Sequence, residues 1–295
     1  MAAQSAALVL EGGGFRGIFT AGALDVLQKE GIYAFDSVWG VSAGAINAVS
    51  YKSRQAGRAM RTSLAFRDDK RFMSLWSFAT TGNMAGAEFM YQEVQNFLDP
   101  CDNETFNTNP MRMYAVATDT VFGTAAYLPC ERLPEDVDKV RASASLPMVS
   151  HRVELDGHLY LDGGTADSIP FAVALGLEGA PRVEGHEGAD RAVVVLTRER
   201  SYIKTDKTER MYLRSHRYDG YEYYIQALTT RADRYNESRR QLFELEKQGR
   251  VLVIEPPGPV KVGNTGSDGE KLLTLYLQGR EAAKAKLDEL REFLA

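Results

Sequence analysis

The sequence has 295 residues, of which 44% are hydrophobic and 25% are charged, and this composition excludes disordered, collagen-like and disulfide-scaffold proteins. Acidic residues outnumber basic ones by 40 to 35. The resulting net charge of −5 argues against a dedicated nucleic-acid-binding protein, which needs surplus cations. The length suits one or two domains with a substantial core.

Cysteine and histidine are scarce. With 2 cysteines and 4 histidines the chain is poor in metal ligands, and we expect no metal site. Cys101 and Cys130 lack C-x-x-C spacing, so we interpret them as free thiols in a reducing compartment, with a disulfide between them left open. The first ten residues contain no Lys or Arg, and no apolar run reaches ~18 residues, so we expect a cytoplasmic protein.

The N-terminal region alternates short apolar runs with amphipathic segments. Residues 6–10 predict a buried strand, 16–30 a helix, 37–40 a second strand and 43–52 a second helix. Strand, turn and helix repeated in this way are typical of a parallel α/β sheet.

The rest of the chain follows the same scheme less regularly. Residues 53–110 look helical and irregular, and the later patterns predict a hairpin over 111–118 and 123–128, a helix at 135–144, strands at 159–161, 192–197 and 251–254, and helices at 217–248 and 271–294. No linker or repeat separates these elements. We therefore expect residues 176–295 to be a C-terminal extension packed on the same domain as residues 6–175.

Residues 12–17, GGGFRG, follow the first predicted strand and match G-x-G-x-x-G through Gly12, Gly14 and Gly17. Backbone N–H groups in such a loop can bind an anion, either the phosphates of a dinucleotide or the oxyanion of an acyl transfer. A dinucleotide site also needs an acidic residue at the end of the second strand, whereas Asp36 precedes that strand. Both interpretations stay open beside that of a simple turn.

Residues 40–44, GVSAG, match G-x-S-x-G at a predicted strand-to-helix junction, which is the context of a nucleophile elbow. Gly40 and Gly44 relieve crowding on either side of Ser42. A serine nucleophile needs a base. None of the four histidines, His151, His158, His186 and His216, lies in a recognisable catalytic context.

Asp162 ends a short predicted strand and is followed by Gly163 and Gly164. A D-G-G sequence is usually only a turn. Placed at a strand end, however, the carboxylate can line a cleft.

Together, GGGFRG at 12–17, GVSAG at 40–44 and DGG at 162–164 resemble the patatin-like phospholipase family in order and spacing. The segment RASASLP, 141–147, is also similar to the stretch that precedes the aspartate in that family, and the resemblance covers roughly residues 6–175. It implies a three-layer α/β fold with a central, mostly parallel sheet flanked by helices.

The resemblance also implies roles for particular residues. Ser42 becomes the nucleophile and Asp162 its only base, without a histidine or a cofactor. Gly12, Gly13 and Gly14 form the oxyanion hole, with Gly13 and Gly14 as the foremost donors, and Arg16 is either structural or helps to orient that loop. The supporting motif positions are Gly17, Gly40, Gly44, Gly163 and Gly164.

The function expected from these roles is hydrolysis of lipid acyl esters, of the phospholipase A or lysophospholipase kind, through an acyl-enzyme. A catalytically silent member that binds lipid or acyl groups is an alternative from another class. A dinucleotide-dependent oxidoreductase using the GGGFRG loop is a further one.

Two stretches bear on access to lipid. The aromatic residues between 72 and 91 suit either a mobile lid and interfacial patch or an ordinary pair of core helices. The basic residues between 198 and 217 suit either anionic headgroups or a solvated helix face. We expect a lipid or acyl-ester substrate, transient contact with a membrane surface and no nucleic-acid partner.

Overall fold

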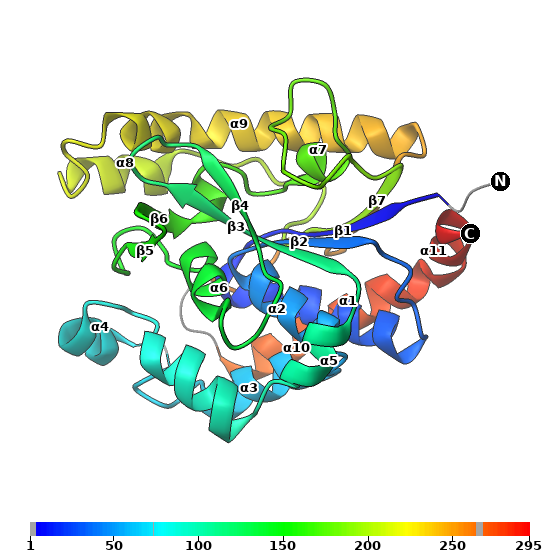
Figure 1. The fold of residues 1–295 in the computed structure, drawn as a ribbon, viewed down its shortest axis with the longest axis horizontal. Coiled ribbons are helices and arrows are strands. Elements are labelled where there is room, and N and C mark those ends of the chain that lie inside the picture. Colours follow the sequence, from blue (N-terminus) through cyan, green and yellow to red (C-terminus); the bar gives the residue numbers. More distant parts are fainter. Residues whose placement is uncertain (1–3, 73, 264–267) are drawn as a thin grey trace.

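The computed structural model describes residues 4–72, 74–263 and 268–295, and within these ranges the strands form one eight-stranded sheet with helices on both faces (Figure 1). The strands are β1 (Ala6–Leu10), β2 (Ser37–Val41), β3 (Arg112–Asp119), β4 (Ala125–Pro129), β5 (Val153–Leu155), β6 (His158–Asp162), β7 (Arg191–Val195) and β8 (Val251–Ile254). The strand order is β5-β6-β3-β2-β1-β7-β8, with β4 also paired to β3.

The main helices are α1 (Gly17–Lys29), α2 (Ala43–Lys52), α3 (Arg58–Phe66), α4 (Leu75–Thr81), α5 (Asn103–Thr108), α6 (Val137–Ser143), α7 (Phe171–Ala174), α8 (Lys207–Arg214), α9 (Glu222–Lys247), α10 (Gly269–Ala285) and α11 (Leu287–Leu294). Short 3-10 turns lie at η1 (Gly14–Arg16) and η3 (Gly163–Thr165), and η2 (Phe89–Leu98) is a π-helix. Helices α7, α8 and α9 cover one face of the sheet, and α1, α2 and α10 lie on the other (Figure 1).

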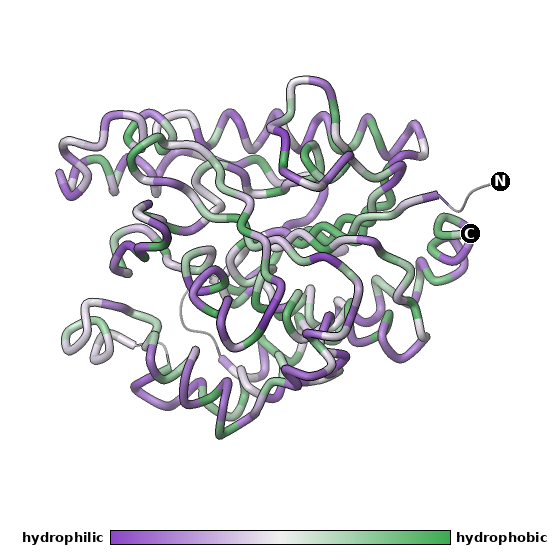
Figure 2. Tube along the Cα trace, in the orientation of Figure 1, coloured by the Kyte–Doolittle hydropathy of each residue, from purple (hydrophilic) through white to green (hydrophobic). Residues whose placement is uncertain are grey.

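This arrangement confirms the predicted α/β fold with a mostly parallel sheet, since β3, β2, β1, β7 and β8 run parallel. Figure 2 shows hydrophobic residues gathered in these central strands and more polar ones along the outer helices. The helix predicted over 217–248 begins later, at Glu222, because residues 215–220 form turns between α8 and α9, with Gly220 at φ +88° just before α9.

Sheet register brings two chain segments to the end of β2. Strand β2 pairs with β3 as far as Val41 opposite Val116, and β6 pairs antiparallel with β3 from Ala117, which lies opposite Asp162. Because β4 occupies the other edge of β3 along these residues, β6 takes over the edge that β2 leaves. The end of β6 therefore lies just beyond the end of β2.

Residues after 175 contribute to the same sheet. Strand β7 pairs parallel with β1, and β8 pairs parallel with β7. Helix α10 packs closely on α1: a Cβ on Gly279 would lie 2.0 Å from the Phe19 carbonyl oxygen. Two segments of the chain after 175 thus flank the first βα unit.

Candidate active site

Ser42 occupies the turn from β2 to α2 in a strained conformation. Its φ is +55° and its ψ −121°, a combination unusual for a residue with a side chain, and it is the N-cap of α2. The backbone N–H of Ser42 donates a 2.9 Å hydrogen bond to Ser143 Oγ, which itself donates to the Val116 carbonyl oxygen at 2.6 Å. This bridge holds the sharp turn that places Ser42 at the C-terminal end of β2.

The glycines on either side of Ser42 permit close packing. A Cβ on Gly44 would lie 2.3 Å from the Leu10 carbonyl oxygen, and one on Gly40 would lie 2.5 Å from Ala45 Cα. Neither distance is sterically allowed. Glycine at both positions is therefore required for α2 to approach β1 and β2.

The glycine loop at 12–14 lies against Ser42. A Cβ on Gly12 would lie 3.2 Å from Ser42 Cβ, and Gly14 adopts φ +54°. The Gly12 carbonyl accepts a 2.9 Å hydrogen bond from Thr197 Oγ1, which anchors the loop. Within the described residues, no hydrogen bond uses the N–H groups of Gly12, Gly13 or Gly14, so these donors are available to a ligand oxygen.

Asp162 lies at the end of β6, with only 3% of its surface exposed. Its Oδ1 accepts a 2.8 Å hydrogen bond from the Gly164 N–H, and its own N–H donates to the Ser145 carbonyl oxygen at 2.8 Å. A Cβ on Gly163 would lie 2.0 Å from the Val116 carbonyl oxygen. The D-G-G turn is thus packed tightly onto β3.

Burial raises the pKa of Asp162 above its ordinary value, and interactions with the Ser42 hydroxyl, the Gly164 N–H and the Arg231 charge offset part of that rise. Ser42 interacts with the carboxylate. Within the described part of the chain, however, no group forms a hydrogen bond of normal length and angle with the buried Oδ2 atom. A raised pKa makes the carboxylate a stronger base than an exposed aspartate.

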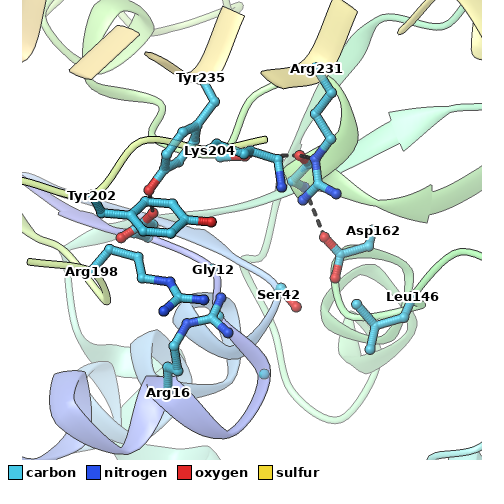
Figure 3. Close-up of a pocket in the computed structure, with 15 residues that line it drawn as sticks. Gly12, Arg16, Ser42, Leu146, Asp162, Arg198, Tyr202, Lys204, Arg231 and Tyr235 are labelled. Atoms are coloured by element: carbon cyan, nitrogen blue, oxygen red, sulfur yellow. Dashed lines mark hydrogen bonds between the residues drawn. The ribbon is translucent and has the colours of Figure 1, made fainter. Parts of the chain in front are cut away.

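Ser42 and Asp162 line one open pocket of about 490 Å³, together with the glycine loop (Figure 3). The wall of this pocket carries the cationic side chains Arg16, Arg198, Lys204 and Arg231. A second, larger pocket of about 870 Å³ shares Ser42 with the first, and its lining is mainly apolar, including Phe15, Ile18, Ile46, Phe72 and Met90. Ser42 therefore lies between a polar and an apolar chamber.

The residues that the alternative mechanisms would need lie elsewhere. None of the four histidines lines the pocket that holds Ser42; His158, for example, pairs with Asp119 at 2.7 Å. Asp36 accepts a 2.8 Å hydrogen bond from the N–H of Ala6, at the opposite end of β1 from the glycine loop. It is therefore too far from that loop to hold the ribose of a dinucleotide.

The aromatic residues of the stretch from 72 to 91 differ in burial. Phe72 and Phe89 are buried in one cluster, whereas Trp76 on α4 is 51% exposed. Met73 lies outside the described residues.

Sequence reasoning did not assign several residues that shape the site. Ser143, in the RASASLP segment, holds the Ser42 turn. Of the basic stretch 198–217, Arg198 and Lys204 line the pocket, whereas others such as Arg214 are exposed. The basic residues were the available signal, but only the fold separates those in the pocket from those in solvent.

Within the described residues no helix is long and apolar enough to cross a bilayer, and no group of three or more His, Cys, Asp or Glu side chains is arranged to hold a metal ion. Cys101 and Cys130 are both buried and free.

Comparison with known proteins finds a match of residues 8–175 to the patatin-like phospholipase family, and of residues 221–295 to a domain of unknown function, DUF6363. The chain is 28% identical over 283 residues to the uncharacterized protein YjjU of Escherichia coli strain K12, covering 93% of this chain and 74% of that protein.

It is also 31% identical over 176 residues to the uncharacterized NTE family protein Mb1092c of Mycobacterium bovis; this match covers 58% of this chain and 46%, about half, of that protein. Among solved structures, VipD from Legionella pneumophila aligns with a TM-score of 0.47 and 14% identity, over 97% of this chain and 67% of that one. The family match spans more than half of the sequence and contains all three motifs, and the chain belongs to the patatin-like phospholipase family.

Proposed function

We propose that this protein hydrolyses the acyl ester bond of a lipid, with Ser42 as nucleophile and Asp162 as the base. The observation that carries the proposal is the position of Ser42. Its strained turn lies beside the buried Asp162 carboxylate and beside backbone N–H groups that are unused within the described residues, where a polar and an apolar pocket meet.

In the first half-reaction, Ser42 Oγ attacks the ester carbonyl and its proton passes to the Asp162 carboxylate. The carbonyl oxygen becomes an oxyanion that accepts hydrogen bonds from the N–H groups at Gly12, Gly13 and Gly14. As the tetrahedral intermediate collapses, the carbon–oxygen bond of the ester breaks and the leaving alcohol takes the proton from Asp162. The acyl group stays on Ser42.

In the second half-reaction, Asp162 accepts a proton from water as the water oxygen attacks the acyl-enzyme. Collapse of the second intermediate returns the proton to Ser42 Oγ and releases the fatty acid. An ordinary aspartate, with a pKa near ~3.9, is a weak base for this task. Burial of Asp162 raises its pKa and improves the match to the serine hydroxyl.

The two pockets suit the two halves of an amphiphilic ester. The apolar pocket, lined by side chains such as Phe15, Ile46 and Phe72, is suited to an acyl chain. The polar pocket is suited to the alcohol half. Exposed apolar side chains on α4 and η2, Trp76, Phe97 and Leu98, support transient contact with a lipid surface as part of the same proposal.

Labelling with a fluorophosphonate tests the proposal. This probe reacts with activated serines, so we expect one adduct by mass spectrometry, located at Ser42. Ser42→Ala should lose both the adduct and the hydrolysis of p-nitrophenyl esters. Ser53→Ala is the matched control: Ser53 is also buried, at the C-terminal end of α2, but does not line either pocket beside Ser42. It should keep both properties.

The alternatives predict different results. A catalytically silent lipid-binding protein would bind fatty acid but form no adduct, and a dinucleotide-dependent enzyme would be stabilised thermally by NAD(H) or NADP(H). Retention of most ester hydrolysis by folded Ser42→Ala would overturn the assignment of the nucleophile.

A further inference from the structure

The polar pocket beside Ser42 holds more positive than negative charge. Two of its cations, Lys204 and Arg231, share a single buried carboxylate: Glu209 Oε1 lies 3.1 Å from Lys204 Nζ and 2.9 Å from Arg231 Nη1. Arg231 also donates a hydrogen bond to the Gly164 carbonyl oxygen. Arg231 is thus tied to the D-G-G turn, and the two cations carry one more positive charge than Glu209 neutralises.

Arg198 has a different environment. Its guanidinium stacks on the Tyr202 ring, 4.4 Å from the centroid, and forms no ion pair with a carboxylate in the described ranges. Its Nε atom is buried and has no hydrogen-bond partner among the described residues. A buried guanidinium N–H without an acceptor carries a desolvation penalty that a bound anion would remove.

Arg16 and Arg198 lie next to one another in the pocket (Figure 3). Burial, and after it the neighbouring Arg198 charge, lowers the pKa of Arg16, while Glu11 offsets part of that effect. Burial and the neighbouring Arg231 lower the pKa of Lys204 in the same way. The electrostatic field of this wall therefore favours an anion.

The two acidic side chains that line the pocket, Glu11 and Asp162, already have other roles. Glu11 accepts hydrogen bonds from the N–H and hydroxyl of Thr197 and from the Tyr235 hydroxyl. Asp162 is the base of the proposed reaction. Within the described lining, no other carboxylate remains to receive a positively charged headgroup such as choline.

We propose that Arg198 and Lys204, beside Arg16, form a subsite for a terminal phosphate on the alcohol half of the ester, so that acyl esters of phosphomonoesters are preferred over neutral and over zwitterionic lipids. This inference rests on the proposed function. Arg198 and Lys204 both lie outside residues 8–175, so the C-terminal extension supplies the substrate preference.

Three soluble esters with the same octanoyl chain test the subsite: 1-octanoylglycerol, its 3-phosphate and its 3-phosphocholine, all at one ionic strength because salt screens the charges. We expect kcat/KM for the 3-phosphate to exceed the other two by about tenfold or more. Arg198→Gln and Lys204→Gln should each reduce that ratio by about tenfold, mainly through KM. Arg214→Gln, on the exposed side of the same basic stretch, should leave the ratio unchanged.

A binding measurement separates the subsite from the catalysis. Inorganic phosphate should raise the thermal midpoint of the parent and of Ser42→Ala alike, and should raise that of Arg198→Gln and Lys204→Gln much less. If no ester is cleaved but this pattern of stabilisation holds, the proposed function fails and the subsite stands. If phosphate stabilises all variants equally, or if all three esters are cleaved at equal kcat/KM, the subsite is wrong. Cleavage of the esters in either case still supports the hydrolase assignment.

Discussion

Burial of Asp162 raises its pKa, and the same burial makes its ionised form costly to the folded state. With a folded-state pKa above the unfolded value, the favourable contribution of this group is complete below the unfolded pKa and is lost as the pH rises through the folded pKa. At pH 7 the ionised side chain therefore destabilises the fold relative to a neutral side chain of the same shape. Stability is lowered at the same residue that the proposed reaction needs.

Asp162→Asn separates these two effects. Asparagine keeps the Oδ1 acceptor for the Gly164 N–H but cannot take a proton, so we expect activity to fall about as far as in Ser42→Ala. At pH 7 the thermal midpoint should rise by about 2–4 °C, for a gain of about 1 kcal/mol. The rise should shrink as the pH falls through the raised pKa, because the parent residue is then neutral too. If Asp162→Asn keeps activity within a few-fold of the parent, Asp162 serves only to form the turn.

The pH profile of the parent enzyme gives a second check at this residue. Since the base must be ionised, kcat/KM should fall on the acid side with an apparent pKa above ~4, the ordinary value for an aspartate. The profile is measured with a neutral p-nitrophenyl ester, whose own charge does not change in this range. An acid limb at or below that ordinary value would contradict the effect of burial on Asp162.

At the scale of single elements, local sequence patterns predict which segments form strands and helices but not how the strands pair. The spacing around Ser42 predicts strand, turn and helix, since sharp turns and close packing need glycine at Gly40 and Gly44. The antiparallel direction of β6 and its place beyond β2 depend on contacts between distant segments, which local periodicity does not encode. For the same reason Ser143, Arg198 and Lys204 could not be assigned to the site from the sequence.

The packing of α2 on β1 is testable through Gly44. A methyl group there would lie 2.3 Å from the Leu10 carbonyl oxygen, so Gly44→Ala must push the helix from the strand. We expect a loss of about 2–3 kcal/mol in the free energy of unfolding, in the range of overpacked sites. Gly258→Ala is the control, since nothing lies within 4 Å of its added Cβ, and should change stability by under about 0.5 kcal/mol. Equal losses of stability in the two variants would mean that α2 does not pack tightly on β1.

The two tryptophans report separately on lipid contact. Trp39 is fully buried and stacks on Tyr114, whereas Trp76 on α4 is 51% exposed. If α4 meets a lipid surface, vesicles should shift the emission of Trp76 to shorter wavelength and protect it from iodide, and Trp76→Ser should abolish both changes. We also expect Trp76→Ser to reduce hydrolysis of vesicle lipids several-fold but not that of a soluble ester. An unchanged spectrum with active vesicle hydrolysis would exclude α4 from that contact.

At the scale of the whole molecule, the first βα unit is held between segments that lie far apart in the chain. Strand β7 covers the edge of β1 that β2 leaves unpaired, and α10 lies against α1. A Cβ on Gly22 of α1 would lie 2.1 Å from the Tyr276 carbonyl oxygen, and the Tyr276 hydroxyl donates to Asp25 Oδ2 at 2.6 Å. Such close backbone contact leaves α1 little room to pack independently of α10.

We therefore expect residues 6–175 and 176–295 to unfold as one unit. The full chain should show a single calorimetric transition whose calorimetric and van't Hoff enthalpies agree. A fragment ending at residue 175 would expose the fully buried β1 along one edge, so it should be insoluble or should give no near-ultraviolet circular dichroism. It would also lack Arg198. A folded fragment, or two resolved transitions in the full chain, would show instead that residues 6–175 are an independent domain. The proposed phosphate preference would then come from a separate C-terminal module.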